Sequence, residues 1–449
     1  MDKRTFLKLC SAVSTPVLSP LLAWAQGEAL KNWAGNVTYG TERLTTATSL
    51  KSVQDFVREH NKFKVLGTRH CFNGIADSSD QFLSLKAMNE VVALDPDART
   101  VTVEAGMSYG QLCPYLDSKG WALPNLASLP HISIVGACMT ATHGSGEKNG
   151  NLATAVSTLE FVDANGNVVQ LSRQQDGDRF RGAVVGLGGL GVVTKITLDI
   201  QPRFTMQQYV YQNLPLKALT SHFDALESAA YSVSLFTDWR NETINQVWLK
   251  IRMESGRVFD VPQNSTERRG RPKIFTLSSR FPRRTARNRW EFWAPGTSGC
   301  PTFGWALPRA LAKSCNRNTS FPVSTQSRQF SRYNACMISL VRTCSYLRSE
   351  QFAADELWMS PCCQQPSVAI HFTWKQDWPN VSKLLPVIEK ELAPFHPRPH
   401  WGKLFTLPPQ QLHSRYSNLP AFVELSRKYD PKGKFQNEFL RFYSFTPVS

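Results

Sequence analysis

The sequence predicts an α+β fold with two domains, and three observations support this prediction. The chain has 449 residues, of which 42% are hydrophobic, and this is enough material for two cores. Short alternating strands are interspersed with segments of helical periodicity along the chain. Hydrophobic strands also run into loops of small residues at Val65–Asn73 and at Leu123–Gly146. We therefore expect one domain built around these two loops and a second domain after it.

Residues 1–25 have the pattern of a signal peptide. A basic start, Lys3–Lys8, precedes a mildly apolar stretch and the small residues of Ala23–Ala25. The Lys-Arg pair resembles a weakened twin-arginine signal, which would export a folded protein. Serines and prolines interrupt the apolar run, so a spanning helix is not expected. We expect a periplasmic or secreted protein. An ordinary secretion signal, or membrane association through this segment alone, is the alternative.

The first domain is expected over residues 32–203, with the following elements. Thr48–Val57 begins with a hydroxyl cap and has apolar residues at helical spacing, which predicts a helix. Lys62–Leu66 is a short strand that leads into the first loop. The remaining expected elements are a strand at Thr100–Glu104, a helix at Tyr109–Leu116 and a tight turn entering a strand at Gly186–Val193.

Both small-residue loops suit the binding of phosphate. Small side chains let backbone N–H groups approach an anion closely. Two such loops without a Walker lysine indicate an extended dinucleotide rather than a nucleoside triphosphate. His70 lies at the mouth of the first loop and supplies a nucleophile that could bond to a cofactor ring. A loop histidine that bonds to a carbonyl group is the alternative.

The loops resemble the flavin-binding half of the vanillyl-alcohol-oxidase-like, PCMH-type flavoproteins, and most closely the alditol (xylitol) oxidase branch of the sugar-1,4-lactone oxidases. The resemblance covers residues 32–203 and about 353–439. It implies a two-subdomain PCMH-type FAD-binding domain, followed by an α+β substrate (cap) domain over residues 204–445. Its sharpest points are Asn32–Asn36, Leu129–Ser133 and His400–Lys403.

The resemblance implies FAD as the cofactor, joined covalently to His70. Where the family often has glycine before this histidine, the chain has Arg69, which costs backbone freedom but adds a phosphate partner. Ala127 matches a small residue beside the flavin in members that use oxygen, and this favours an oxidase. The expected cofactor-binding residues are Val65, Leu66, Gly67, Thr68, Arg69, His70, Cys71, Ser128, Ser133, Gly136, Thr140, Ala141, Thr142, His143 and Val192.

The resemblance also places Lys403, Thr373 and Ser128 as the catalytic set. Lys403 would bond to the reacting hydroxyl and, in a desolvated pocket, could take its proton. Thr373 would donate a hydrogen bond to a substrate hydroxyl. A solvated surface charge is the alternative for the lysine. His371 and His400 are expected to have structural roles.

Residues 262–352 differ sharply in composition from the rest. They contain 16 Lys/Arg against 3 Asp/Glu, so most of the net charge of +16 lies here. Neither helical nor strand periodicity is evident, and we expect disorder. Other-frame readings of the codons permitted by Arg289–Thr297, Ala312–Pro322 and Tyr346–Phe352 include MGVLGPWY, KELQSEYFVP and SEIRTI, which resemble the family's cap domain. We interpret the segment as frameshifted; a divergent insertion is the alternative.

The frameshift interpretation has a consequence for the substrate pocket. The family's Glu-x-Arg pair, which lies in that pocket, appears only in the alternative frame. Arg348 and Glu350 of the chain as written would then not be its equivalents. The normal frame resumes near Ala353, and strands at Ala230–Phe236, Gln246–Arg252 and Val368–Trp374 and a helix at Val381–Glu389 are expected around the segment.

The predicted reaction is hydride transfer from an alditol such as xylitol or sorbitol to flavin, with oxygen reduced to hydrogen peroxide. The alternatives are an arabinono- or gulonolactone oxidase, an FAD-binding relic without the Glu-x-Arg pair, and a basic surface-binding protein. Outside residues 262–352 the net charge is only +3, so no nucleic-acid partner is expected. The ten cysteines show neither CxxC nor zinc spacing, which predicts neither a metal site nor a disulfide framework.

Overall fold

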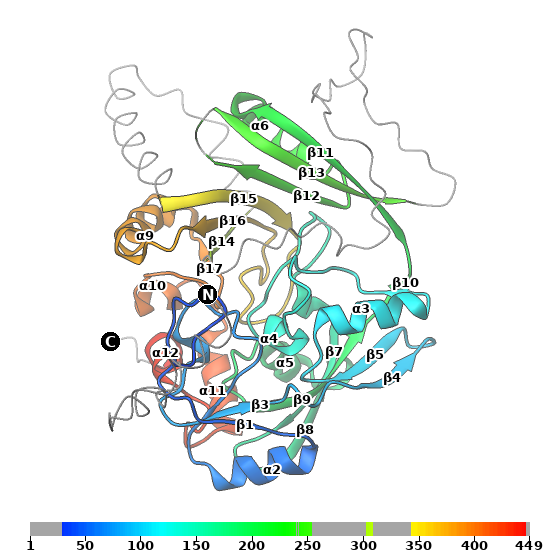
Figure 1. Cartoon of the computed structure of the whole chain (residues 1–449), viewed down its shortest axis with the longest axis vertical. Helices are drawn as coiled ribbons and strands as arrows, with labels where there is room; N and C mark the ends of the chain where they lie inside the picture. Colours follow the sequence, from blue (N-terminus) through cyan, green and yellow to red (C-terminus); the bar gives the residue numbers. More distant parts are fainter. Residues whose placement is uncertain (1–28, 239, 241, 254–301, 309–342, 446–449) are drawn as a thin grey trace, which may run out of the picture. The chain divides into compact units, whose positions relative to one another are not determined.

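The computed structural model describes residues 29–238, 240, 242–253, 302–308 and 343–445 (Figure 1). The larger compact unit of the chain begins at Lys31. The expected signal peptide, 1–25, and most of the segment 262–352 therefore lie outside the described residues.

Two sheets form the first half of the larger unit. A parallel three-stranded sheet has the order β1-β3-β2, and an antiparallel five-stranded sheet has the order β4-β5-β9-β7-β8. The strands are β1 (Leu44–Thr46), β2 (Lys64–Val65), β3 (Phe82–Ser84), β4 (Val91–Asp95), β5 (Thr100–Glu104), β7 (Val156–Val162), β8 (Val168–Ser172) and β9 (Val192–Asp199). A small pair joins β6 (Trp121–Ala122) to β10 (Gln201–Pro202).

Two helices of this half lie at predicted positions: α2 (Leu50–Glu59) at Thr48–Val57 and α3 (Tyr109–Ser118) at Tyr109–Leu116. Ser49 caps helix α2 through a capping box with Ser52, which confirms the hydroxyl cap read from the sequence. The other helices of this half are η1 (Gly74–Ala76), α4 (Ile134–Met139), η2 (Leu152–Ala155) and α5 (Arg173–Val184).

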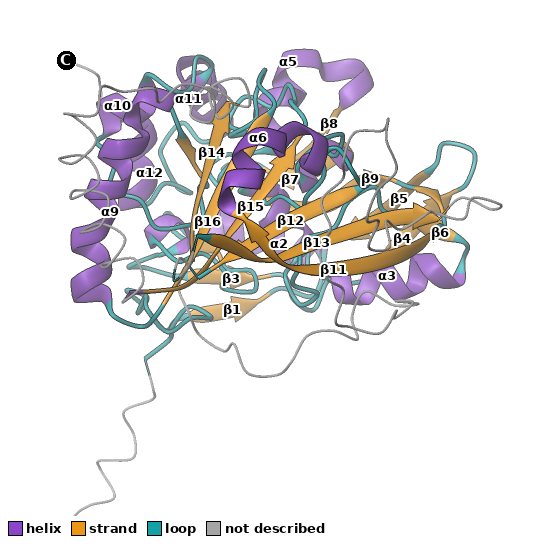
Figure 2. Cartoon of the chain, turned by 90° about the horizontal axis from the view of Figure 1, so that it is seen from above, coloured by secondary structure: helices purple, strands orange, loops and turns teal. Residues whose placement is uncertain are grey.

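An antiparallel seven-stranded sheet forms most of the second half, in the order β11-β13-β12-β15-β16-β14-β17 (Figures 1 and 2). Helix α6 (Leu216–Glu227) packs on β11 and β12. The strands are β11 (Thr205–Pro215), β12 (Ser232–Thr237), β13 (Thr243–Met253), β14 (Thr302–Pro308), β15 (Cys344–Phe352), β16 (Ser367–Trp374) and β17 (Arg398–Pro399). The later helices are α9 (Trp378–Leu392), η3 (Ala393–Phe395), α10 (Pro409–His413), α11 (Leu419–Tyr429), α12 (Glu438–Leu440) and η4 (Arg441–Phe445).

Two strands correct the expectation that residues 262–352 lack regular structure. Strand β15 pairs with β12 on one side and with β16 on the other, and β14 pairs with β16 and β17. Ladder hydrogen bonds join backbone groups, so a strand between two partners forms without a strong side-chain pattern of its own. The prediction of disorder is therefore wrong for Thr302–Pro308 and Cys344–Phe352.

The end of the chain packs on the first half. The main apolar cluster contains Val101 and Leu123 of the first half together with Trp401 and Phe422. The buried Lys64 ammonium donates to the carbonyl oxygens of Gly188 (2.9 Å) and Phe435 (3.0 Å). The division into residues 32–203 and 204–445 thus stays a prediction, since the core is continuous across it.

Replacing Asn437 with alanine is expected to lower the free energy of unfolding by about 2–3 kcal/mol, because buried groups would lose their partners. The Asn437 amide donates to the carbonyl oxygens of Gly74, Ile75 and Asp77 and accepts from the Leu440 amide. Urea titration followed by fluorescence measures this loss. Asn165→Ala, at an exposed turn, is the matched control, and equal losses in the two variants would contradict the prediction.

Candidate active site

The loop after β2 presents a row of backbone amides. Among the residues that the structure describes, the N–H groups of residues 67–71 donate to no protein acceptor. A Cβ added to Gly67 or to Gly136 would lie 2.9 or 2.7 Å from the Ser133 hydroxyl, so both loops approach this side chain closely. The Ser133 amide in turn donates to Thr68 Oγ1 over 3.2 Å. This donor set fits an anionic, phosphate-bearing cofactor.

Arg69 has a left-handed backbone with a φ of 62°. This conformation favours glycine, which the related family often has at this position. The guanidinium donates to the carbonyl oxygen of Lys31 over 3.1 Å, and the Arg69 carbonyl accepts from the Trp33 amide. The charged group expected to meet a phosphate is therefore bonded to the main chain in this structure.

Arg69→Gly is expected to raise the free energy of unfolding by up to about 1 kcal/mol. A residue with a Cβ is strained in the left-handed backbone conformation, and glycine is not. FAD uptake should persist, because the amide row is unchanged. Arg69→Val, with a β-branched side chain at positive φ, should lower stability instead. Thermal unfolding and bound-flavin content check both variants. A less stable glycine variant would contradict the expectation.

His70 lies in a cluster of three rings. Its Nε2 contacts His131 Nε2, and the centroids of the two imidazoles are 4.5 Å apart. The Trp33 ring lies 4.5 Å from His70 and 5.8 Å from His131. Burial, then His131 and Lys403, lower the pKa of His70 to about 3, so the imidazole is neutral near pH 7. No backbone carbonyl holds this ring among the described residues, unlike the alternative considered from the sequence.

Lys403 is held beside the first loop. Asn73 donates to the carbonyl oxygens of Trp401 (2.8 Å) and Lys403 (2.7 Å), and the Phe72 amide donates to Gly402. The Lys403 ammonium lies 4.4 Å from the centroid of the Phe72 ring. Burial, reinforced by the nearby positive charge of Arg348, lowers the pKa of Lys403 to about 7. The amine is therefore partly neutral near pH 7, and the alternative of a solvated surface lysine is not what the structure shows.

Arg348 and Glu350 face the same region from β15. Arg348 donates to Ser128 Oγ (3.0 Å), contacts His371 Nδ1 (3.4 Å) and pairs with Glu350 over 3.3 Å. Glu350 is only 3% exposed and accepts from the Ser234 hydroxyl over 2.6 Å. These two residues were set aside on sequence grounds as out of frame, yet they lie with the expected catalytic Ser128. Their order along the strand is the reverse of the family's Glu-x-Arg pair.

His371 and His143 lie beside this ion pair, and the His400 ring lies 6.0 Å from that of His143. His143 Nδ1 lies 3.7 Å from Glu350, and its ring stacks on Phe352 at 4.7 Å. Burial is the largest cause that lowers the pKa of His143, His371 and His400, and all three are neutral near pH 7. His400 accepts from the Gly402 amide over 3.1 Å, which fits the structural role expected for it.

Among the other expected residues, Thr373 lies near His371 and Cys71 lies near Gly402. Thr373 is 6% exposed and lies two residues from His371 on β16, so their side chains share one face. Cys71 lies next to Gly402, whose added Cβ would be 3.3 Å from its sulfur, and burial raises the pKa of its thiol to about 11. Val65 pairs with Leu83 in the small parallel sheet, and the Leu66 amide donates to the Leu83 carbonyl oxygen. The Thr140 hydroxyl bonds to the Gly136 carbonyl oxygen and to Thr142, and Ala141 is buried at a turn. Val192 is fully buried in the core with Val53 and Phe63.

The structure thus places His70, Cys71 and Lys403 close together on one side. Arg348 lies near Lys403 and contacts Ser128 and His371 on the other side, and His143 lies beside its partner Glu350. The sequence reasoning missed His131, Ser234 and the pair on β15. His131 stands in the quoted segment Leu129–Ser133, but nothing in its spacing indicated a contact with His70, which is distant in sequence.

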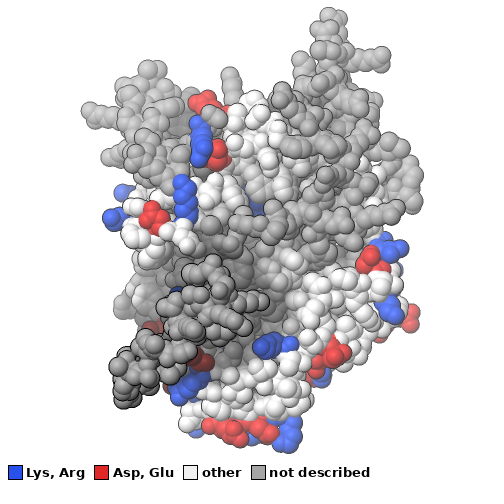
Figure 3. Space-filling model, in the orientation of Figure 1, with Lys and Arg blue, Asp and Glu red and all other residues white. Residues whose placement is uncertain are grey.

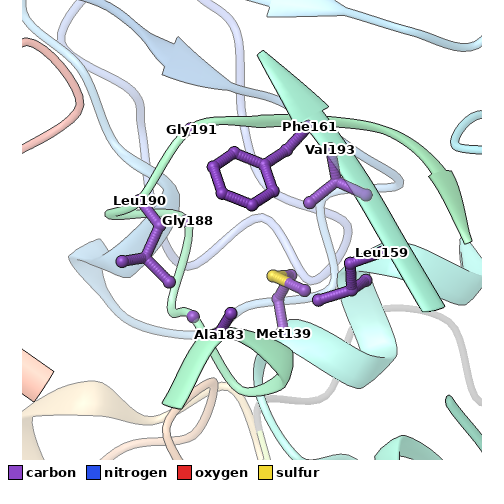
Figure 4. Close-up of a pocket in the computed structure, with 9 residues that line it drawn as sticks. Met139, Leu159, Phe161, Ala183, Gly188, Leu190, Gly191 and Val193 are labelled. Carbon is purple, nitrogen blue, oxygen red and sulfur yellow. The ribbon is translucent and has the colours of Figure 1, made fainter. Parts of the chain in front are cut away.

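An apolar cavity lies apart from these residues (Figure 4). It is lined by Met139, Leu159, Phe161, Ala183, Gly186, Gly188, Leu190, Gly191 and Val193. None of the expected catalytic residues lines it. Its wall includes part of the glycine-rich turn that was expected at Gly186–Val193.

Charged side chains of both signs are mixed on the face shown in Figure 3. Within the described ranges, no three His, Cys, Asp or Glu side chains gather in a way that could hold a metal ion. In the same ranges no helix combines the length and the apolar character needed to cross a bilayer.

Two family models match the chain. The model described as FAD binding domain matches residues 42–172, and the model described as D-arabinono-1,4-lactone oxidase matches residues 310–443. The first match contains both small-residue loops. The second contains Lys403, Thr373 and the pair on β15.

Relatives and solved structures agree with these matches. An alditol oxidase from Streptomyces sp. is 37% identical, over 92% of this chain and 98% of its own length. L-gulonolactone oxidase from Mus musculus is 24% identical, with the same coverage of each chain. A cholesterol oxidase from B. sterolicum has a TM-score of 0.73 at 13% identity, covering 93% of this chain and 96% of that chain, which shows the fold.

Proposed function

We propose that this chain, which belongs to the FAD-dependent alditol and sugar-lactone oxidase family, oxidises a terminal alditol such as xylitol or sorbitol. As a member of that family it is an oxidoreductase that acts on CH–OH groups. Oxygen is the proposed acceptor and hydrogen peroxide the second product. The observation that carries the proposal is the half-buried Lys403, whose ammonium lies 4.4 Å from the Phe72 ring beside the first loop and whose pKa is lowered to about 7. The chain's 37% sequence identity to an alditol oxidase supports the choice of substrate.

The two loops are the residues that would hold FAD. The amides of residues 67–71, which have no protein acceptor within the described part of the chain, and the close approach of Gly67 and Gly136 to Ser133 suit its pyrophosphate. FAD supplies the acceptor for a hydride from the carbinol carbon. We propose that it is joined covalently to His70, whose neutral ring keeps a lone pair for such a bond.

Lys403 is the proposed proton acceptor for the reacting hydroxyl. A neutral amine is required, and burial beside Arg348 provides it near pH 7. Thr373 is proposed to donate to a second hydroxyl of the polyol. Ser128, fixed by Arg348 Nη1 at 3.0 Å, would keep its own hydroxyl hydrogen available for the substrate.

The rate of polyol oxidation is expected to rise with pH through about 7 and then to level off. Only the neutral amine of Lys403 can take a proton, and its population grows above its pKa. The histidines around it are already neutral in this range. A profile of kcat/KM against pH measures this effect. A rate that falls between pH 6 and pH 8 would contradict the assignment.

Two other functions have specific support. The match to the D-arabinono-1,4-lactone oxidase model and the L-gulonolactone oxidase relatives favour a sugar lactone as substrate. The reversed order of Arg348 and Glu350 favours a chain that binds FAD but turns over poorly.

Peroxide detection across xylitol, sorbitol, arabinono-1,4-lactone and gulono-1,4-lactone separates these functions. Polyol-dependent peroxide is the expected result. Peroxide with lactones alone would replace the alditol proposal. Bound FAD without peroxide from any of the four compounds would identify an impaired enzyme.

We also retain two proposals about the gene product. Export to the periplasm would give a mature chain that begins near residue 26, as N-terminal sequencing of protein from cell fractions can test. A membrane-bound, uncleaved chain would be the contrary result. Resequencing the coding DNA for residues 262–352 tests the frameshift interpretation, which requires single-base insertions or deletions near both ends.

A further inference from the structure

We propose that His131 is the proton acceptor that prepares His70 for covalent attachment of the flavin. The inference rests on the proposed covalent link at His70. It concerns how that link forms, and it assigns a role to a residue outside the expected catalytic set.

The contact between the two imidazoles carries the inference. Nε2 of His70 meets Nε2 of His131, with ring centroids 4.5 Å apart and the ring planes inclined by 47°. A neutral imidazole has one N–H donor and one acceptor nitrogen, so one ring must donate to the other here. Trp33 lies against both rings and holds them in this arrangement. The Trp33 amide is itself bonded to the loop through the Arg69 carbonyl over 2.9 Å.

The direction of this hydrogen bond decides which nitrogen can react. If His70 Nε2–H donates to His131, the lone pair of His70 is on Nδ1 and is available to an electrophilic carbon. Burial lowers the pKa of both histidines, so neither ring is protonated near pH 7. His131 is also the more exposed of the two and can pass a proton on to water.

The atoms balance as follows. The new bond joins His70 Nδ1 to the 8α carbon of the flavin, while the Nε2 proton of His70 passes to His131 and then to water. A C–H bond of the 8α carbon breaks, and its proton also leaves. The two electrons of that bond pass to the flavin ring with the uptake of protons, and oxygen, the acceptor of this enzyme class, removes them as hydrogen peroxide.

The test follows attachment itself and does not require polyol turnover. Full-length chain from flavin-starved cells is mixed with FAD, and the fraction that stays with acid-precipitated protein is measured over time. The variants are His131→Ala and His70→Ala, with His60→Gln as a control histidine that bonds to Phe56 O on helix α2. Total FAD binding before precipitation shows whether each variant folds, and added imidazole tests for chemical rescue.

His131→Ala is expected to bind FAD and to attach it at least tenfold more slowly, with the rate partly restored by imidazole. An unchanged rate in His131→Ala would overturn the inference, as would a loss that imidazole does not relieve. Native chain that holds FAD without any covalent bond would instead show that the proposed link is wrong. Peptide mass analysis that finds the flavin on His131 would reject both the covalent link at His70 and the role of His131 as proton acceptor.

Discussion

Lys403→Met is expected to slow polyol-dependent reduction of the flavin by about 10²–10⁴-fold, the usual contribution of a positioned base. Methionine keeps most of the apolar stem but cannot take a proton. The backbone bonds that hold the segment, from Asn73 and to His400, do not involve the side chain. FAD content and stability should therefore change little.

Anaerobic single-turnover mixing with xylitol, followed by flavin absorbance, measures the rate even if steady-state turnover is low. Lys390→Met, at an exposed position of α9, is the matched control. The rise in rate near pH 7 should also disappear in Lys403→Met. Reduction within threefold of the native rate would exclude Lys403 as the base.

Breaking the ion pair on β15 is expected to have the largest effect on stability. Arg348→Met leaves Glu350 buried with the Ser234 hydroxyl and no cation, and should cost about 3 kcal/mol. Glu350→Gln should cost less, because the amide can still accept from Ser234. The double variant should be more stable than the sum of the two losses predicts, with a coupling of about 1–3 kcal/mol. Urea unfolding of the native chain, the two single variants and the double variant measures this double-mutant cycle. Additive losses would mean that the ion pair contributes nothing to the free energy of unfolding.

The same pair offers a test of its reversed order. Exchanging the charges, Arg348→Glu with Glu350→Arg, gives the Glu-x-Arg order of the related family at the same backbone positions. If that order is needed in the substrate pocket, polyol turnover should rise by at least tenfold over the native chain. A fall in turnover with normal FAD content would show that the native order is itself functional.

Local signals predicted much of the fold. The cap at Ser49, the alternation of Thr100–Glu104 and the apolar pattern of Val368–Trp374 depend on neighbours a few residues away, and the structure has α2, β5 and β16 there. The two small-residue loops were recognised as candidate dinucleotide-binding loops from small residues beside strands, and the family resemblance then implied FAD. Such features are written in consecutive residues, which is why the sequence alone indicates them.

The rest depends on contacts between distant residues. Strand β15 has a weak pattern and forms because two partner strands surround it, so its composition misled the prediction. Arg348 meets Ser128 across 220 positions of the chain. His131 and His70 are 61 positions apart, and neither segment alone shows that their rings touch.

The buried Lys64 has a consequence for biosynthesis. Its ammonium is shared between Gly188 and Phe435, and the loop bearing His70 is fastened by Asn73 to Trp401 and Lys403. A nascent chain that has emerged only as far as residue 203 contains Gly188 but lacks Phe435, Trp401 and Lys403. Domains usually fold as they leave the ribosome. Because residues near the C-terminus anchor the loop bearing His70 here, the proposed FAD site should be completed only after translation ends. Cofactor supply would then be needed at release of the polypeptide rather than during its elongation.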